Sequence, residues 1–223
     1  YIPIDAKTPK GRLNSIVQQV KPDLVVTSQN YADCFVGENY FFFEDYDNLL
    51  QEKEFCNLWG DGLAYCIFTS GSTGNPKGVM IEKKAFQSFI MGTNMAIDFT
   101  VLCITSMSFD IFGLESVYAL NQGKTVFLAN EAQRNNPRLL KSFIMQNNID
   151  CVQMTPSRLT LLLCTDRTMQ SLQNVKVIIV GGEDFPAKLL SALHSRISAR
   201  VYNAYGPSEA TIWVSYSELL DSK

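Results

Sequence analysis

From Val101 onward the chain alternates short apolar runs with helical segments, and this alternation limits the fold more than any other feature. The spacing of apolar residues predicts strands at the following positions: 101–104, 125–128, 149–154, 175–180 and 200–203. Three predicted helices between them begin at a proline, which the first turn of a helix tolerates, and cover these ranges: 137–146, 156–163 and 186–195. No hairpin dipeptide separates the strands, so we expect an α/β fold with largely parallel sheets and helical crossovers.

The N-terminal part of the chain predicts a similar but less regular pattern. A helix is expected near residues 13–20, a short strand at 24–27, a buried strand at 63–68 and a helix at 82–96. The aromatic run at 40–43 fits either a strand or an aromatic plug. Its burial against a neighbouring element is favoured over a role as a ligand platform.

Composition excludes several classes of protein. The 223 residues are 46% hydrophobic and 18% charged with a net charge of −3, as in a globular chain with a sizeable core and no nucleic-acid partner. No apolar stretch approaches the roughly 20 residues of a membrane span, and the first residues do not resemble a signal peptide. The six cysteines form no Cys-x-x-Cys pair, so we expect a reduced, cytoplasmic chain without a zinc site. The single histidine, His194, lies among polar neighbours and reads as a surface residue.

Residues 69–78 follow an apolar strand and combine hydroxyls, glycines and one lysine. Gly71, Gly74 and Gly78 allow backbone N–H groups to approach a ligand, and Lys77 adds a positive charge, which together suit nucleotide phosphates. The loop is not a Walker A motif, because the sixth position counted from Gly71 is Pro76. A glycine-rich surface loop without a ligand is the alternative.

Other unusual loops also follow predicted strands. They cover 106–110, 181–184 and 204–209. Because ligands gather at the carboxyl ends of parallel strands, we expect these loops and residues 69–78 to meet at one site. Each loop taken alone could be an ordinary turn.

The ordered string at 65–78, Tyr-Cys-Ile-Phe-Thr-Ser-Gly-Ser-Thr-Gly-Asn-Pro-Lys-Gly, resembles the signature loop of the adenylate-forming superfamily. This superfamily includes acyl-CoA synthetases, firefly luciferase and the adenylation domains of nonribosomal peptide synthetases, and the match is closest to the last. The opening Tyr-Ile-Pro-Ile-Asp and the Asn-Ala-Tyr-Gly-Pro-Ser-Glu stretch at 203–209 also resemble that family, with Ser208 where the family usually has threonine. Lys83 and Lys84 stand where members often have a histidine.

The resemblance implies the large N-terminal subdomain of an acetyl-CoA-synthetase-like fold. It implies that ATP and an amino acid give an aminoacyl-AMP and that a carrier protein's phosphopantetheine thiol then takes the aminoacyl group. Tyr205 would stack on adenine, Ser208 would touch the α-phosphate and Glu209 would hold Mg²⁺. The full set of implied ATP-binding residues is Thr69, Ser70, Gly71, Ser72, Thr73, Gly74, Lys77, Gly181, Gly182, Glu183, Asn203, Ala204, Tyr205, Gly206 and Ser208.

Asp110 follows Phe109 as in the family segment whose aspartate pairs with the substrate ammonium. A helix N-cap is the alternative role for this aspartate, and both roles could hold. The positions carried over as the substrate pocket are Asp110, Ile111, Leu114, Gln153, Ile178, Val180, Ala204, Ile212 and Trp213. Most are apolar and Trp213 is bulky, so we expect a small substrate, glycine or alanine. Val180 and Ala204 depart from the glycine-activating pattern.

The resemblance extends from Tyr1 to about Trp213 but covers only part of a family domain. A downstream Tyr-Arg-Thr-Gly-Asp segment and the C-terminal subdomain with its catalytic lysine have no counterpart, so no catalytic residue is assigned. We therefore expect residues 1–223 to be a partial adenylation domain that is nearly inert alone. The alternatives are a fragment of an acyl- or aryl-CoA synthetase, which Asp110 disfavours, and a non-catalytic interaction fragment.

Overall fold

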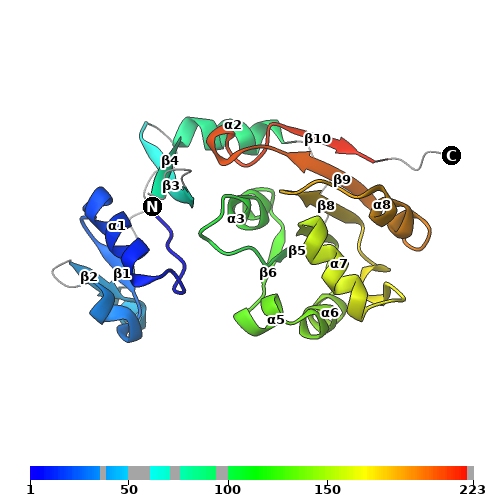
Figure 1. Ribbon diagram of the computed structural model, residues 1–223, viewed down its shortest axis with the longest axis horizontal. Coiled ribbons are helices and arrows are strands. Elements are labelled where there is room, and N and C mark those ends of the chain that lie inside the picture. The colour runs from blue at the N-terminus through cyan, green and yellow to red at the C-terminus, as the bar shows by residue number, and fades with distance from the viewer. Residues whose placement is uncertain (36–38, 50–60, 71–75, 94–99, 220–223) are drawn as a thin grey trace. The chain divides into compact units, whose positions relative to one another are not determined.

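The computed structural model describes residues 1–35, 39–49, 61–70, 76–93 and 100–219. The chain divides into two compact units, Tyr1–Lys84 and Ala85–Lys223. Each unit has its own secondary structure, and most of the regular sheet belongs to the second (Figure 1).

The described part of the first unit contains the helix α1 and two small sheets. Its elements are α1 (Lys10–Val20), β1 (Val25–Thr27), η1 (Gln29–Cys34), β2 (Tyr40–Phe42), η2 (Phe43–Leu49), β3 (Leu63–Ser70) and β4 (Pro76–Glu82). Strands β1 and β2 pair in parallel, whereas β3 and β4 pair antiparallel. The aromatic run at 40–43 thus supplies a strand that continues into a 3₁₀ turn.

Strand β4 corrects the expectation that residues 69–78 form one loop. Thr69 still belongs to β3, and Lys77 and Gly78 already belong to β4, where they pair with Thr69 and Phe68. Gly78 suits this pairing because a Cβ there would lie 2.8 Å from the Cys66 Sγ atom. Pairing with β3, rather than the local Pro-Lys-Gly sequence, therefore determines that residues 76–78 are extended.

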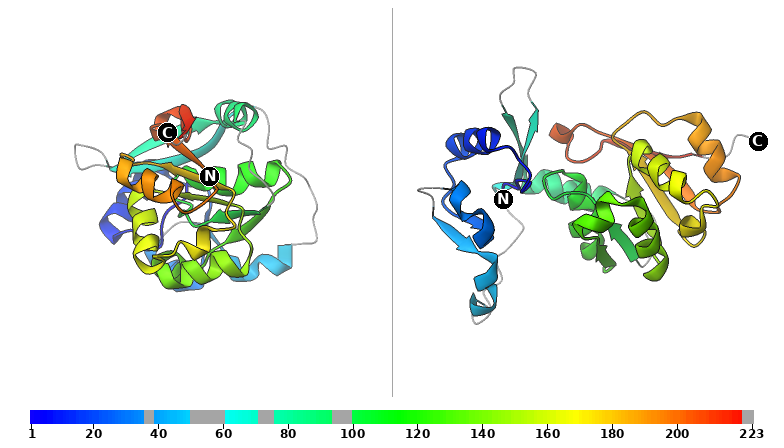
Figure 2. Two further views of the ribbon diagram at one scale, coloured as in Figure 1. Left: turned by 90° about the vertical axis from the view of Figure 1, so that its right-hand side faces the viewer. Right: turned by 60° about the horizontal axis from the view of Figure 1, so that its bottom comes forward.

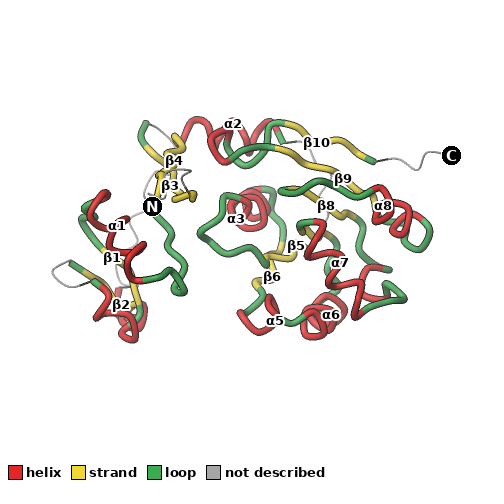
Figure 3. Tube along the Cα trace, in the orientation of Figure 1, coloured by secondary structure: helices red, strands yellow, loops and turns green. Residues whose placement is uncertain are grey.

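The second unit is a six-stranded sheet with helices. Its strands are β5 (Thr100–Cys103), β6 (Thr125–Leu128), β7 (Cys151–Met154), β8 (Val177–Gly181), β9 (Arg200–Tyr205) and β10 (Ser215–Glu218). The strand order is β10-β9-β8-β7-β5-β6, and every neighbouring pair is parallel except β10 with β9. Figure 3 shows the short strands separated by helices along the chain. The α/β fold with a largely parallel sheet, predicted from the alternation, is confirmed, and the antiparallel edge strand β10 was not expected.

The helical elements of this unit connect the strands. They are α2 (Lys83–Gly92), which begins at the end of the first unit, α3 (Ile111–Gly113), the π-helical turn η3 (Leu114–Tyr118), α4 (Ala119–Asn121), α5 (Glu131–Asn135), α6 (Pro137–Gln146), α7 (Pro156–Thr165), η4 (Gln170–Leu172), α8 (Ala187–His194) and η5 (Ser208–Ala210). Side-chain caps fix two of the helix starts: Asn136 accepts from the Arg138 N–H group before α6, and Thr155 accepts from the Arg158 N–H group before α7. These caps explain why the helices begin at Pro137 and Pro156, as the sequence predicts.

The sheet separates two apolar clusters. One face packs against α6, α7 and α8 through residues such as Leu140, Leu159 and Leu193. The other packs against α2 and the α3–η3 segment through Phe89, Leu114 and Tyr118. Helices α6 and α7 lie side by side over the first face (Figure 2). Of the helices in the described ranges, none is long and apolar enough to cross a membrane.

Candidate functional site

The carboxylate of Asp110 lies beside the hydroxyl of Ser208, with the Glu209 carboxylate close enough to act on it electrostatically. Asp110 directly precedes α3, in the connection that follows β5, and Ser208 and Glu209 form η5 after β9. Strands β5 and β9 run in the same direction through the parallel pairs β5–β7, β7–β8 and β8–β9, so their carboxyl ends lie at one edge of the sheet. The structure therefore brings together two of the loops that the sequence singles out.

Asp110 is a buried carboxylate, with 9% of the residue exposed. Burial raises the pKa of this carboxyl above its ordinary value, and the Glu209 carboxylate raises it further, while the Ser208 hydroxyl opposes the shift by donating a hydrogen bond. Asp110 also stands at the N-cap position of α3, and although no full capping hydrogen bond forms, the N–H group of Ile111, the first residue of α3, helps to lower the pKa of the carboxyl. The start of α3 and the Ser208 hydroxyl thus both contact this carboxylate, and its pairing with a substrate ammonium stays a prediction.

Two glycines at this edge stand where a side chain would meet neighbouring backbone: Gly181 beside β9, and Gly206 beside the turn that precedes β10. A Cβ on Gly181 would lie 2.6 Å from the Ala204 carbonyl oxygen, and one on Gly206 would lie 2.2 Å from the Trp213 Cα atom. Gly182 has a φ of +83°, a conformation that favours glycine. These glycines are thus needed for backbone packing at the site edge, whatever ligand binds there.

Glu183 has a structural partner that sequence reasoning did not identify. Its Oε2 atom accepts a hydrogen bond from the Ser157 hydroxyl at 2.5 Å and one from the Ser157 N–H group at 3.1 Å. These bonds lower the pKa of the exposed Glu183 carboxyl. Glu183 thus ties the β8 loop to the start of α7, and its implied contact with ATP stays a prediction.

Tyr205 ends β9 with an exposed ring, 69% of the residue being accessible. An exposed flat face is available to stack on a planar ligand. Asn203 and Ser208 are half-buried and Glu209 is exposed. In the described part of the chain, no three His, Cys, Asp or Glu side chains gather as a metal-binding cluster.

The backbone after Glu209 is strained. Thr211 and Ile212 have φ angles of +65° and +73°, which β-branched residues rarely adopt. Both residues are buried, as is the following Trp213. The strained turn sends the Ile212 and Trp213 side chains into the cluster that also holds Leu114 and Ala204.

The apolar wall predicted for the substrate needs a correction on β8. Leu114, Ala204, Ile212 and Trp213 share one face of the sheet. Ile178 and Val180 instead pack into the core of the opposite face, against α6, α7 and α8. Because successive side chains of a strand point to opposite faces, two of the carried-over positions cannot line the same wall as the others.

Ile179 and Gly181 are the β8 residues on the predicted wall. Ile179 belongs to the same cluster as Leu114 and Trp213, and Gly181 lies two residues further along. By the same alternation on β7, Gln153 faces this side, since Val152 and Met154 pack on the other. Ile111 packs against the edge of the cluster. Glycine at 181 leaves this wall without a side chain at that point.

The residues predicted in the first unit are only partly described. Thr69 is half-buried in β3 and Lys77 is exposed on β4. Ser70 ends β3, and Gly71, Ser72, Thr73 and Gly74 lie outside the described residues.

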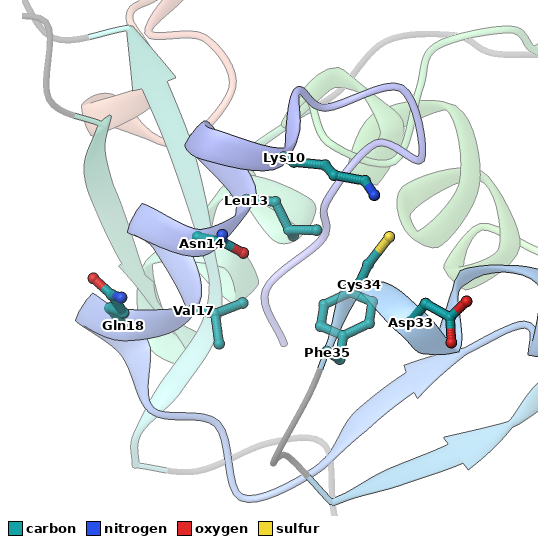
Figure 4. Close-up of a pocket in the computed structure, with 8 residues that line it drawn as sticks. All are labelled: Lys10, Leu13, Asn14, Val17, Gln18, Asp33, Cys34 and Phe35. Atoms are coloured by element: carbon teal, nitrogen blue, oxygen red, sulfur yellow. The ribbon is translucent and has the colours of Figure 1, made fainter.

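A hollow of about 360 Å³ is present in the first unit, where Leu13 and Val17 of α1 face Cys34 and Phe35 (Figure 4). None of the predicted site residues lines it, so it is separate from the candidate site.

The sequence matches the AMP-binding enzyme family over residues 1–223. It is 30% identical over 226 aligned positions to a dimodular nonribosomal peptide synthase of Bacillus subtilis, covering 96% of this chain and 9% of that protein. It is 31% identical to a D-alanine–D-alanyl carrier protein ligase of Bacillus licheniformis, covering 99% of this chain and 46% of that one. The chain thus spans less than half the length of these relatives.

Solved structures agree on the fold. A four-domain nonribosomal peptide synthetase bound to AMP and glycine aligns with a TM-score of 0.83 at 24% identity, over 99% of this chain and 17% of that one. A second nonribosomal peptide synthetase, bound to alpha-methyl-L-serine-AMP, aligns with a TM-score of 0.85 at 20% identity, over 100% of this chain and 26% of that one.

Proposed function

Because the chain belongs to the AMP-binding enzyme family over its whole sequence, we propose that it forms part of an amino-acid adenylation domain. The proposed reaction joins an amino acid to ATP, giving an aminoacyl-AMP and pyrophosphate. A phosphopantetheine thiol on a carrier protein then accepts the aminoacyl group as a thioester. Residues 1–223 would belong to the N-terminal subdomain of that domain.

The buried carboxylate of Asp110 carries the proposal. It lies at the carboxyl edge of the sheet with the Ser208 hydroxyl as a partner and the Glu209 carboxylate nearby. Such a carboxylate gains from a cation, because an ammonium group would form a charge-assisted hydrogen bond and offset the unfavourable burial. An α-amino acid offers that ammonium, whereas a fatty or aryl acid does not. Asp110 therefore favours an amino acid over the substrate of an acyl-CoA synthetase.

ATP would bind along the same edge. Tyr205 would offer its exposed ring to the adenine, and the Ser208 hydroxyl would donate to the α-phosphate. By the resemblance of residues 65–78 to the family loop, Thr69, Ser70 and Lys77 are also proposed to be ATP-binding residues. Glu209 would hold Mg²⁺, which when bound neutralises part of the phosphate charge.

The walls of the site favour a small amino acid. Gly181 contributes no side chain, but Ile179, Ile212 and Trp213 fill the face beside it. Bulky walls of this kind would leave little room for a substrate side chain, so we propose glycine or alanine as substrate. The names of the relatives, which include a D-alanine–D-alanyl carrier protein ligase, support an amino acid and a carrier protein as partners.

The test is amino-acid-dependent exchange of labelled pyrophosphate into ATP, measured on the protein encoded by the complete reading frame. All twenty amino acids and D-alanine are compared. We expect exchange with glycine or alanine and little with bulky residues. Preference for a large aromatic or charged amino acid would overturn the small-substrate assignment. Exchange that depends on a fatty or aryl acid instead would replace the amino-acid assignment with an acyl-CoA synthetase.

A further inference from the structure

Glu115 is a buried carboxylate that the proposed function leaves unused. The residue is 1% exposed and is the second residue of the π-helical turn η3. Its Oε2 atom accepts hydrogen bonds from the N–H groups of Ile104 and Thr105, both at 2.8 Å. Its Oε1 atom accepts a third from the Thr105 hydroxyl at 2.7 Å. The carboxylate is therefore fully engaged with the chain just after β5.

The contacted residues open the connection that carries Asp110. Beyond Thr105, the Ser106 and Ser108 hydroxyls lie 3.0 Å apart, and the Phe109 N–H group donates to the Ser106 carbonyl at 3.0 Å. The Gly113 N–H group then donates to the Asp110 carbonyl at 2.8 Å. Hydrogen bonds thus hold the connection at its start, in its middle and at Asp110, and the backbone joins these three points.

The π-helical turn makes this contact geometrically available. Leu114, Glu115 and Ser116 are all buried, although three consecutive residues of an α-helix ordinarily point in different directions. Leu114 faces the substrate wall while Glu115 reaches the end of β5. A widened turn of this kind is often found at functional sites.

We propose that Glu115 is a positioning residue for Asp110: it fixes the connection from β5 to α3 so that the Asp110 carboxylate stays beside Ser208, where the substrate ammonium binds. The proposal rests on the proposed function. Without an acceptor at 115, the N–H groups of buried Ile104 and half-buried Thr105 would lose their partner. The loop would then have to move to expose them.

A general contribution to stability is the competing explanation, and Asp166 offers a control with similar burial and hydrogen bonding, which differs in its ion pair with Lys141 at 2.9 Å. The Asp166 carboxylate is also buried and accepts from the Gln170 and Ser171 N–H groups at 3.1 and 2.8 Å and from the Ser171 hydroxyl at 2.7 Å. It directly follows α7, which starts at the carboxyl edge after β7, so Asp166 lies at the opposite edge of the sheet. Its loss should disturb the fold but not Asp110.

The experiment compares the wild type with Glu115→Ala, Glu115→Gln and Asp166→Ala in the complete protein. Pyrophosphate exchange gives the KM for the amino acid and for ATP, and hydrogen–deuterium exchange reports on residues 104–110. For Glu115→Ala we expect the amino-acid KM to rise about 10- to 100-fold, the KM for ATP to change much less, and exchange in 104–110 to increase. Asp166→Ala should lower thermal stability and leave the amino-acid KM and the 104–110 exchange unchanged.

For Glu115→Gln we expect the amino-acid KM and the hydrogen exchange of residues 104–110 to be close to those of the wild type. Its amide oxygen can accept the two N–H groups, and its NH₂ group can donate to the Thr105 hydroxyl. If Glu115→Ala does not fold, Glu115→Asp, which is one methylene shorter, replaces it. Equal effects of the 115 and 166 variants on the amino-acid KM, or a Gln variant as impaired as the Ala variant, would overturn the proposal. A wild type that responds to no amino acid would fail the proposed function instead, and the hydrogen exchange comparison would still decide whether Glu115 holds the loop.

Discussion

The Asp110 carboxylate accepts a hydrogen bond from the Ser208 hydroxyl, although the two residues lie near opposite ends of the second unit's sequence. The parallel sheet creates this contact, because β5 and β9 both end at the same edge. One residue is implied in recognition of the amino acid and the other in contact with the α-phosphate. If both roles hold, this hydrogen bond would join the residue that binds the amino acid to the residue that binds the α-phosphate of ATP.

Replacement of Asp110 by asparagine tests its role directly. We expect kcat/KM for the amino acid to fall about 100- to 1000-fold, because an ammonium group would lose its charged partner in a buried site. Thermal stability at neutral pH should not fall, since burial raises the pKa of the carboxyl that is removed. Pyrophosphate exchange and thermal denaturation measure the two effects. Wild-type amino-acid dependence in the variant would contradict the assignment.

Gly181→Ala should destabilise the protein by about 1–3 kcal/mol, because the new Cβ would lie 2.6 Å from the Ala204 carbonyl oxygen. Gly11→Ala is the matched control: nothing lies within 4 Å of a Cβ at that position of α1, so stability should be unchanged or rise by up to about 1 kcal/mol. Urea denaturation of both variants provides the comparison. Equal effects would show that the close approach of β8 to β9 is not rigid.

The two faces of β8 predict different outcomes for neighbouring residues. Ile178→Ala should lower the free energy of unfolding by about 2–5 kcal/mol and leave amino-acid preference unchanged, because Ile178 packs in the opposite core. Ile179→Ala should lower it similarly and also admit larger amino acids, because Ile179 belongs to the predicted wall. A panel of amino acids in the exchange assay, run beside urea denaturation, separates these results. A change of preference in the Ile178 variant alone would restore the original assignment of the wall.

Glu115 predicts a pH dependence of stability. Burial raises the pKa of its carboxyl from 4.5 to about 7, although hydrogen bonds from Thr105 and Ile104 oppose the shift. An acid whose pKa is raised on folding contributes stability that is fully present below about pH 4.5 and is lost as the pH rises to about 7. The stability of the wild type relative to Glu115→Gln should therefore decrease by about 3 kcal/mol across this range. Urea denaturation at several pH values measures it, and a constant difference would contradict the prediction.

Much of the second unit can be predicted from the sequence because local signals agree with the tertiary structure. Helix α6 begins and ends where Pro137 and the spacing of apolar residues indicate, and β6 has the predicted bounds. Strand β4 was missed because Pro-Lys-Gly is typical of loops, and only pairing with β3 makes it a strand. Pairing of this kind is not a local property of the sequence.

The candidate site shows the same division. The meeting of Asp110, Ser208 and Glu209 follows from their places after parallel strands. Ile178 and Val180 were predicted to line the substrate wall although they face the other side of the sheet. Residues 177–180 are uniformly apolar, as in strands buried on both sides, so no alternation shows which of them faces the site. The burial of Glu115 could not be predicted from the sequence, because a charged residue in a helical segment is ordinarily exposed to solvent.

The alternation along β8 also bears on how such a protein can diversify. Val177 and Ile179 pack on the face that carries the predicted substrate wall, and Ile178 and Val180 pack against the helices of the opposite face. A lineage could therefore exchange residues on one side and acquire a new preference without rebuilding the packing on the other.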